Sequence, residues 1–230
     1  MSKNTANMEH GTYKVSEETK ARLVNAAGEL FSLRGTDTVT LREIAELAGA
    51  VPNAVCYHFG DKEGLVAAVR EYALRLWDEE RLEKYFQQNE TLLATRDGCR
   101  QMVANTIDLY FGILCDEGQP QWVNRFLLRG MITMQWEGDR HETVTKRILE
   151  TFCRIYTRIT GNDDQITATT WAMAIMAPGA ILAASEFDFV HYRKSDGIDY
   201  TFLRRLQATV TRNALLSLGL EEKQPTHPFE

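Results

Sequence analysis

The sequence has few of the residues from which metal sites and disulfide frameworks are built. Its four cysteines lie far apart, and no two of them form a Cys-x-x-Cys pair; they are Cys56, Cys99, Cys115 and Cys153. No two of its five histidines stand four residues apart. These absences argue against a structural zinc site. A signal peptide is also missing, so we expect a cytoplasmic protein with reduced thiols.

The motifs that accompany catalysis are missing as well. We find no nucleophile paired with a base, no phosphate-binding loop, no carboxylate pair set by spacing and no cofactor fingerprint. We therefore expect neither an enzyme nor a bound cofactor or metal.

The chain also lacks the excess of basic residues that usually marks a nucleic-acid-binding protein. Its formal net charge is −6, and residues 1–62 hold seven Lys and Arg against eight Asp and Glu. This balance disfavours tight non-specific binding to DNA, although Arg42 and Lys62 supply positive charge locally.

The longest uncharged run covers residues 165–185 and admits two interpretations. A bilayer span needs roughly 20 consecutive apolar residues. The strongly apolar part covers only residues 171–184, and Pro178-Gly179 interrupts it. We therefore favour a buried or interface helix over a membrane span.

Apolar residues recur with a helical period along the chain, and we find no convincing strand or internal repeat. This pattern predicts an all-α protein of about nine helices. The predicted helices cover residues 16–34, 40–49, 52–59, 61–86, 96–115, 120–134, 139–160, 164–190 and 199–218. The polar segments 1–15 and 219–230 are expected to form a flexible arm and a flexible tail.

Three small or β-branched residues, Ala45, Gly49 and Val55, have the spacing of a helix-turn-helix. Two helices that cross through a short turn need a small side chain at their closest approach, which Ala45 supplies. Gly49 can end the first helix in a left-handed conformation without a Cβ clash. Val55 then packs the second helix onto the first. Thr40-Leu-Arg-Glu43 fits a capping box that begins the first of these helices.

The segment 40–49, followed by Tyr57-His-Phe-Gly-Asp-Lys-Glu-Gly-Leu65, resembles the TetR family of transcriptional regulators. The match covers about residues 16–70, and its second segment most resembles the CecR-like branch. The resemblance implies a homodimer that binds double-stranded DNA at an operator and releases it when a small molecule binds. It implies DNA contacts from Thr40, Arg42, Pro52, Asn53, Ala54, Tyr57, His58 and Lys62.

We therefore expect a helix-turn-helix DNA-binding domain at residues 16–62. A larger helical domain for effector binding and dimerisation is expected at residues 63–218. Two positions depart from the family pattern: Val51 stands where a capping Ser is usual, and Cys56 where Tyr or Asn is usual. A missing cap costs about 1 kcal/mol. Cys56 allows a redox-sensor hypothesis, but an inert residue is favoured because no resolving cysteine is close in sequence.

Asn53 is the best candidate for reading a base, because a side-chain amide can pair bidentately with adenine. The alternative is a polar surface residue at a helix start. For Arg42 a phosphate contact is favoured over a base contact. For His58 a phosphate contact or packing is favoured over a metal or pH role.

Aromatic and sulfur-containing side chains of the larger domain are candidates for an effector pocket, and we expect an apolar or aromatic effector. Most of these side chains are expected to be core. The candidates are Trp77, Trp122, Phe126, Arg129, Met131, Trp136, Tyr156, Trp171 and Met173. Arg129, a charge inside an apolar helix, needs a partner. Pairing with a carboxylate such as Glu137 or Glu186 is favoured over an anionic ligand.

The helix at 164–190 is rich in small residues, and the last helix carries an apolar stripe. Together they predict a four-helix dimer interface formed by Ala172, Met176, Ala180, Ala183, Leu203, Leu206 and Val210. A two-fold dimer places its reader helices about 34–36 Å apart, or a small multiple, and therefore calls for a palindromic operator.

The leading hypothesis is a ligand-responsive DNA-binding regulator, most simply a repressor, in which effector and DNA weaken each other's binding. One alternative is an all-helical enzyme, which the missing catalytic motifs disfavour. The other is a protein-interaction adaptor without DNA binding, which the acidic balance and the missing cap at Val51 favour.

Overall fold

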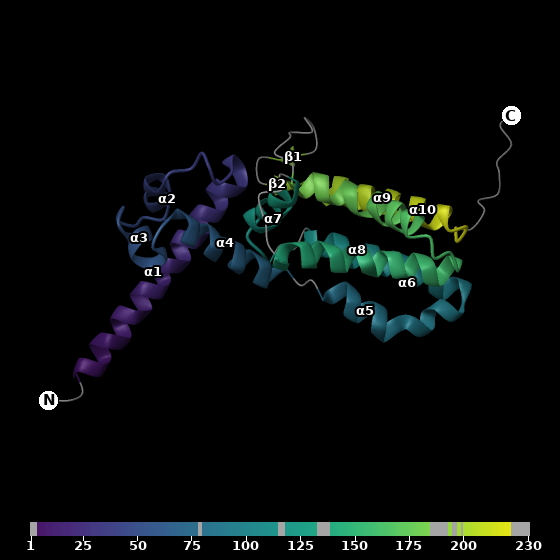
Figure 1. Ribbon diagram of the computed structural model, residues 1–230, viewed down its shortest axis with the longest axis horizontal. Helices are drawn as coiled ribbons and strands as arrows, with labels where there is room; N and C mark the ends of the chain where they lie inside the picture. Colours follow the sequence, from purple (N-terminus) through teal and green to yellow (C-terminus); the bar gives the residue numbers. More distant parts are fainter. Residues whose placement is uncertain are drawn as a thin grey trace. The chain divides into compact units, whose positions relative to one another are not determined.

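A computed structural model of the protein describes residues 4–77, 80–114, 118–132, 139–184, 193–194, 197–198 and 200–221. These residues form ten α-helices, one 3-10 helix and one pair of short strands (Figure 1). The elements are α1 (Asn4–Arg34), α2 (Leu41–Leu47), α3 (Ala54–Phe59), α4 (Lys62–Leu76), α5 (Arg81–Asn89), η1 (Glu90–Ala94), α6 (Arg96–Leu114), α7 (Trp122–Ile132), α8 (Asp139–Thr160), α9 (Gln165–Ala184), β1 (Arg193–Lys194), β2 (Gly197–Ile198) and α10 (Tyr200–Ser217). The predicted all-α class is confirmed.

The antiparallel pair of β1 and β2 was not predicted from the sequence. Each strand holds only two residues. That length is too short to show the alternation of apolar and polar positions by which strands are recognised.

The chain divides into two compact units. The first contains residues 1–77 and 119–133, and the second contains residues 78–118 and 134–230. The first unit therefore extends beyond the helix-turn-helix expected at residues 16–62, because α4 and α7 both pack against α1.

The first unit is built around the apolar face of α1. Leu23, Ala27 and Phe31 on this face are almost fully buried, as their helical spacing predicted. Gly28 on the same helix lies against Trp122 of α7, where a Cβ atom would come within 2.5 Å of the indole ring. Tyr72 of α4 stacks on Trp122 with ring centroids 5.9 Å apart. The absence of a side chain at residue 28 thus makes room for the α7 indole between α1 and α4.

Two helix boundaries differ from the predictions. α1 begins at Asn4, in the segment expected as a flexible arm. Extending an existing helix costs little free energy once the helix is nucleated.

The predicted helix 61–86 is two helices, since Trp77 ends α4 in an extended conformation and α5 begins at Arg81. Trp77 is buried in the first unit and Leu82 in the second. The chain thus leaves one core and enters the other here, with no Pro or Gly to reveal the break.

The second unit has α6 at its centre, in contact with α5, η1, α8, α9 and α10 (Figure 1). Its core includes Phe111 of α6 and Phe152 of α8, both almost completely buried. Gly179 of α9 faces α6, where a Cβ atom would lie 2.8 Å from Leu114 Cδ1. Burial raises the pKa of Cys99 and of Cys153, so both thiols stay protonated near neutral pH. Cys115 lies outside the described residues.

For the segment that forms α9, the sequence admitted two interpretations, a membrane span and a buried or interface helix. Residues 165–183 are long and apolar enough to cross a bilayer, and 39% of an 18-residue stretch within them is buried inside the protein. Ala168, Ala172 and Ile175 are among the buried residues of α9. The helix contacts α8, α10 and α6. The described helix ends at Ala184, so the predicted continuation to residue 190 lies outside the described residues.

Candidate functional site

The turn between α2 and α3 has the geometry that the sequence predicts. Gly49 adopts φ of +59°. Its N–H donates to the carbonyl of Glu46 at 3.1 Å, and the N–H of Ala50 donates to the carbonyl of Ala45 at 2.8 Å. This pair of bonds is a Schellman motif, which satisfies carbonyls at the end of α2. Ala45 and Val55 are both buried where the two helices meet.

The start of α2 is fixed by the predicted capping box. The N–H of Thr40 donates to Glu43 Oε2 at 2.8 Å, and the N–H of Glu43 donates to Thr40 Oγ1 at 3.3 Å. Arg34, at the end of α1, also donates to Glu43 Oε1 at 2.9 Å. The bond from the Thr40 backbone, then the Thr40 hydroxyl and Arg34, lower the pKa of Glu43 from 4.5 to about 2.

The lowered pKa of Glu43 predicts an acid-sensitive start of α2. The folded form prefers the ionised carboxylate, so this contribution is complete above about pH 4.5 and is lost as the pH falls towards 2. We expect the Thr40 amide resonance to titrate with a midpoint near pH 2, and to lose this titration in Glu43→Gln. A midpoint near the ordinary Glu value, measured by NMR, would show that the box does not hold in solution.

α3 begins two residues later than predicted, at Ala54, so its N-cap is Asn53 and not Val51. Asn53 makes no side-chain capping bond there, which leaves its amide available to another partner. Gly60 closes α3 with φ of +82°. Asp61 then caps α4 by accepting from the N–H of Gly64 at 2.7 Å.

Most of the predicted DNA-contacting side chains are accessible in the first unit. Thr40, Arg42, Pro52, Asn53 and Tyr57 are exposed, Tyr57 to 82%, and His58 and Lys62 are partly exposed. They come from the start of α2, the turn, α3 and the start of α4. Ala54 differs, because it is 7% exposed; its methyl group packs into the core and is unavailable to a base. Cys56 is exposed on α3.

A model of the bacterial regulatory proteins of the tetR family matches residues 23–69, which cover this helix-turn-helix. The similarity to the tetR family is thus established for the helix-turn-helix and the helices that flank it.

Curated TetR-family relatives match the same N-terminal region. The HTH-type transcriptional regulator TtgR of Pseudomonas putida is 41% identical over 58 residues, which are 25% of this chain and 28% of TtgR. The HTH-type transcriptional regulator AcrR of Shigella flexneri is 34% identical over 64 residues, 28% of this chain and 30% of AcrR. The chain thus spans under a third of the length of either relative.

Solved structures extend the likeness to the whole TetR-family fold. A bacterial regulatory protein in the tetR family from Rhodococcus RHA1 matches with a TM-score of 0.54 at 18% identity, covering 88% of this chain and 96% of that one. A transcriptional regulator from Aquifex aeolicus VF5 matches with a TM-score of 0.52 at 16% identity, covering 86% and 99%. At these identities the likeness establishes the fold alone.

The residues predicted to bind an effector are divided between the two units. Trp77, Trp122 and Phe126 are each less than 5% exposed and belong to the first unit. In the second unit Tyr156 and Trp171 lie together, with ring centroids 5.6 Å apart, and Met173 is half exposed. Trp136 and the side chain of Met131 lie outside the described residues. The large aromatic side chains are therefore mostly core.

Arg129 contacts the end of α1. Its guanidinium donates to the carbonyls of Leu33 at 2.8 Å and Ser32 at 3.4 Å. The N–H of Gly35 donates to Phe31, and the hydroxyl of Thr38 to Arg34, both at 2.9 Å. All four final carbonyls of α1 thus have donors, two of them from Arg129.

Among the described residues Arg129 thus contacts a helix C-terminus, and its pairing with a carboxylate stays a prediction. Backbone carbonyls there carry partial negative charge, which a guanidinium balances. The suggested partners Glu137 and Glu186 lie outside the described residues.

The predicted dimer residues are largely used within the chain. Ala172, Met176, Ala183, Leu203 and Val210 are each less than 8% exposed, so a second copy cannot reach them, while Ala180 and Leu206 are partly exposed. α9 and α10 turn these faces towards each other and their neighbours. The apolar side chains that α9 exposes are different ones: Ile166 at 78%, Met173 at 50% and Ile181 at 53%.

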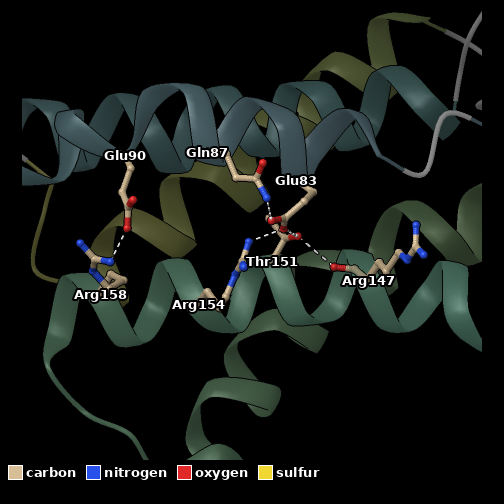
Figure 2. A network of polar contacts seen from close by, with 7 residues as sticks. All are labelled: Glu83, Gln87, Glu90, Arg147, Thr151, Arg154 and Arg158. Carbon is tan, nitrogen blue, oxygen red and sulfur yellow. Dashed lines mark hydrogen bonds and ion pairs between the residues drawn. The ribbon is translucent and has the colours of Figure 1, made fainter.

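A charged groove of about 950 Å³ lies between α5 and α8 in the second unit. It is lined by Glu80, Glu83, Lys84, Phe86, Gln87, Glu90, Lys146, Arg147, Leu149, Glu150, Cys153, Arg154, Thr157, Arg158, Gln165 and Thr169. Figure 2 shows side chains of α5 and α8 meeting across it. None of the predicted effector residues lines this groove. The sequence signal for it is the helical spacing of Arg147, Arg154 and Arg158, which aromatic patterning does not detect.

Proposed function

We propose that this protein is a cytoplasmic transcriptional regulator, most simply a repressor, that binds a palindromic operator and is released by a small molecule. The observation that carries this proposal is the helix-turn-helix, in which the buried Ala45 of α2 and Val55 of α3 leave other side chains of α3 accessible. The N-terminal part of such a second helix enters the major groove in known complexes of this motif.

The DNA-binding form is proposed to be a two-fold dimer. Ile166, Met173 and Ile181 are seven and eight residues apart along α9, so they share one helix face, and all three are half exposed or more. An apolar stripe on this scale favours contact with an identical copy over solvent. Two reader helices would then meet two half-sites of a palindrome.

Replacing Asn53 with alanine is the direct test of base reading. DNA sequences bound by the protein are first selected from a random pool, and affinity is then measured by gel shift. We expect Asn53→Ala to lower affinity by about 1–3 kcal/mol and to relax the preference at one base position. Its unfolding midpoint should stay unchanged, because Asn53 makes no capping bond.

Leu33→Ala, an exposed apolar side chain elsewhere in the same unit, is the control and should bind like the native chain. Equal affinity and sequence preference in Asn53→Ala would contradict base reading at this residue. Failure of the native protein to bind any DNA, even at low salt, would favour the adaptor hypothesis.

A further inference from the structure

The groove between α5 and α8 is large, and most of its lining residues carry a charged or polar group. Its volume of about 950 Å³ lies within the range of small-molecule sites. Its apolar lining is confined to Phe86, Leu149 and Cys153, and the other lining residues are charged or polar. This composition fits a charged molecule better than the apolar effector expected from the sequence.

The two long walls of the groove carry opposite charges. α8 supplies a cationic row, which we define as Lys146, Arg147, Arg154 and Arg158. α5 and its two cap residues supply an acidic row, which we define as Glu80, Glu83 and Glu90. Arg147 pairs with Glu80 at 3.8 Å, and the other two arginines pair with the facing glutamates (Figure 2).

Glu83 shows how the groove receives a carboxylate. Its side chain accepts bonds from Arg154, from Gln87 and from the hydroxyl of Thr151, the last at 3.1 Å. The Arg154 guanidinium also lies over the Phe86 ring, 4.7 Å from its centroid. Donors from both helices thus converge on one carboxylate beside an aromatic surface, and the pKa of Glu83 is lowered, chiefly by Arg154. The protein's own side chain occupies a ready-made anion receptor.

These ion pairs are weak enough to be exchanged. The side chains of Arg158 and Glu90 are 56% and 43% exposed, and those of Arg154 and Glu83 are 47% and 28% exposed. Exposed pairs contribute at most about 1 kcal/mol each. A ligand carboxylate or phosphate can bind the same guanidinium in a bidentate manner. The displaced glutamate then turns into water at little cost.

The spacing of the arginines determines how long an anion must be to contact two of them at once. Arg154 and Arg158 are one helical turn apart, about 6 Å along the axis, and Arg147 lies about 10 Å further on. A single small anion would engage one guanidinium, whereas a linear molecule with two anionic groups would bridge two of them.

We propose that the groove between α5 and α8 is a binding site for an organic dianion, bearing carboxylate or phosphate groups, that takes the arginines of the cationic row from the glutamates of α5. Ligand binding then breaks the ion pairs that join α5 and its caps to α8. Because α5 follows α4 along the chain, we infer that loss of these pairs influences the helix-turn-helix unit. That last, regulatory step rests on the proposed function, and the binding step does not.

The test uses the full chain without DNA. Adipate, a linear dicarboxylate, is titrated by calorimetry, with inorganic phosphate as a compact anion and adipamide as a neutral control. We expect saturable adipate binding that raises the unfolding midpoint, weaker phosphate binding and none with adipamide. Arg154→Gln/Arg158→Gln should lose at least tenfold in adipate affinity.

The matched control is Arg212→Gln. It removes an arginine of α10 that pairs with Glu221 outside the groove, so this variant should bind adipate normally. If the double glutamine variant misfolds, Arg154→Lys/Arg158→Lys keeps the charges but loses the guanidinium forks, and should still bind less tightly. Absence of saturable adipate binding, or equal binding in the variants, would overturn the site. Adipate that binds but leaves a complex with selected DNA intact would overturn the regulatory step alone.

Discussion

Replacing Arg129 with methionine is expected to destabilise the first unit by roughly 2–3 kcal/mol. Methionine retains the apolar stem but removes the guanidinium that donates to the carbonyls of Ser32 and Leu33. Hydrogen bonds made by charged groups contribute about 1.5–3 kcal/mol. The effect should appear as a lower urea midpoint and as faster hydrogen exchange at Gly35, whose N–H closes α1.

Arg22→Met is a suitable control, because it removes an exposed arginine of α1 that donates only to the hydroxyl of Thr19 on the same helix, at 3.3 Å, among the bonds described. It should change stability by less than about 0.5 kcal/mol. Arg129→Lys keeps the charge and one donor group, so it should fall between the native chain and Arg129→Met. If Arg129→Met has the native urea midpoint and the native rate of hydrogen exchange at Gly35, then water replaces the guanidinium without loss of stability.

Replacing Met173 with glutamate is expected to convert the proposed dimer to a single chain in sedimentation experiments. In a two-fold dimer through the exposed α9 face, residue 173 approaches its own copy, so two carboxylates would face each other in an apolar contact. Affinity for a palindromic site should fall at least 100-fold, because the second half-site is no longer bound from the same assembly.

Met173 is half exposed, so folding of the single chain should survive, and helical circular dichroism should be unchanged. Thr91→Glu adds the same charge at an exposed position of η1, and should leave both mass and DNA affinity as in the native chain. A dimeric Met173→Glu variant would place the interface elsewhere in the molecule.

The helix-turn-helix was predictable because its determinants are local. The Thr40–Glu43 box, the left-handed Gly49 and the Asp61 cap each depend on residues within about four positions of one another. Such short-range bonds form whatever the rest of the chain does. The error of two residues at the start of α3 is of the same kind, since a Pro suits several positions near a helix start.

The effector residues were less predictable, because residue type alone does not distinguish a core from a pocket. Trp122 and Phe126 proved to be core, and the groove is lined by charges that looked like an ordinary solvated surface. The pairing of Glu83 with Arg154 joins residues 71 positions apart. The helical spacing of charged residues does not show which charged face of one helix will pack against which face of another.

The helical nature of most elements, the caps and turns of the helix-turn-helix, and its resemblance to the TetR family follow from the amino-acid sequence, since each depends on neighbours along the chain. Tertiary structure alone decided that α7 joins the first unit, that Arg129 closes α1, and which face of α9 remains exposed. These outcomes depend on which surfaces meet after the chain has folded back over roughly 60 to 100 residues, where small differences in packing and desolvation select one partner among many.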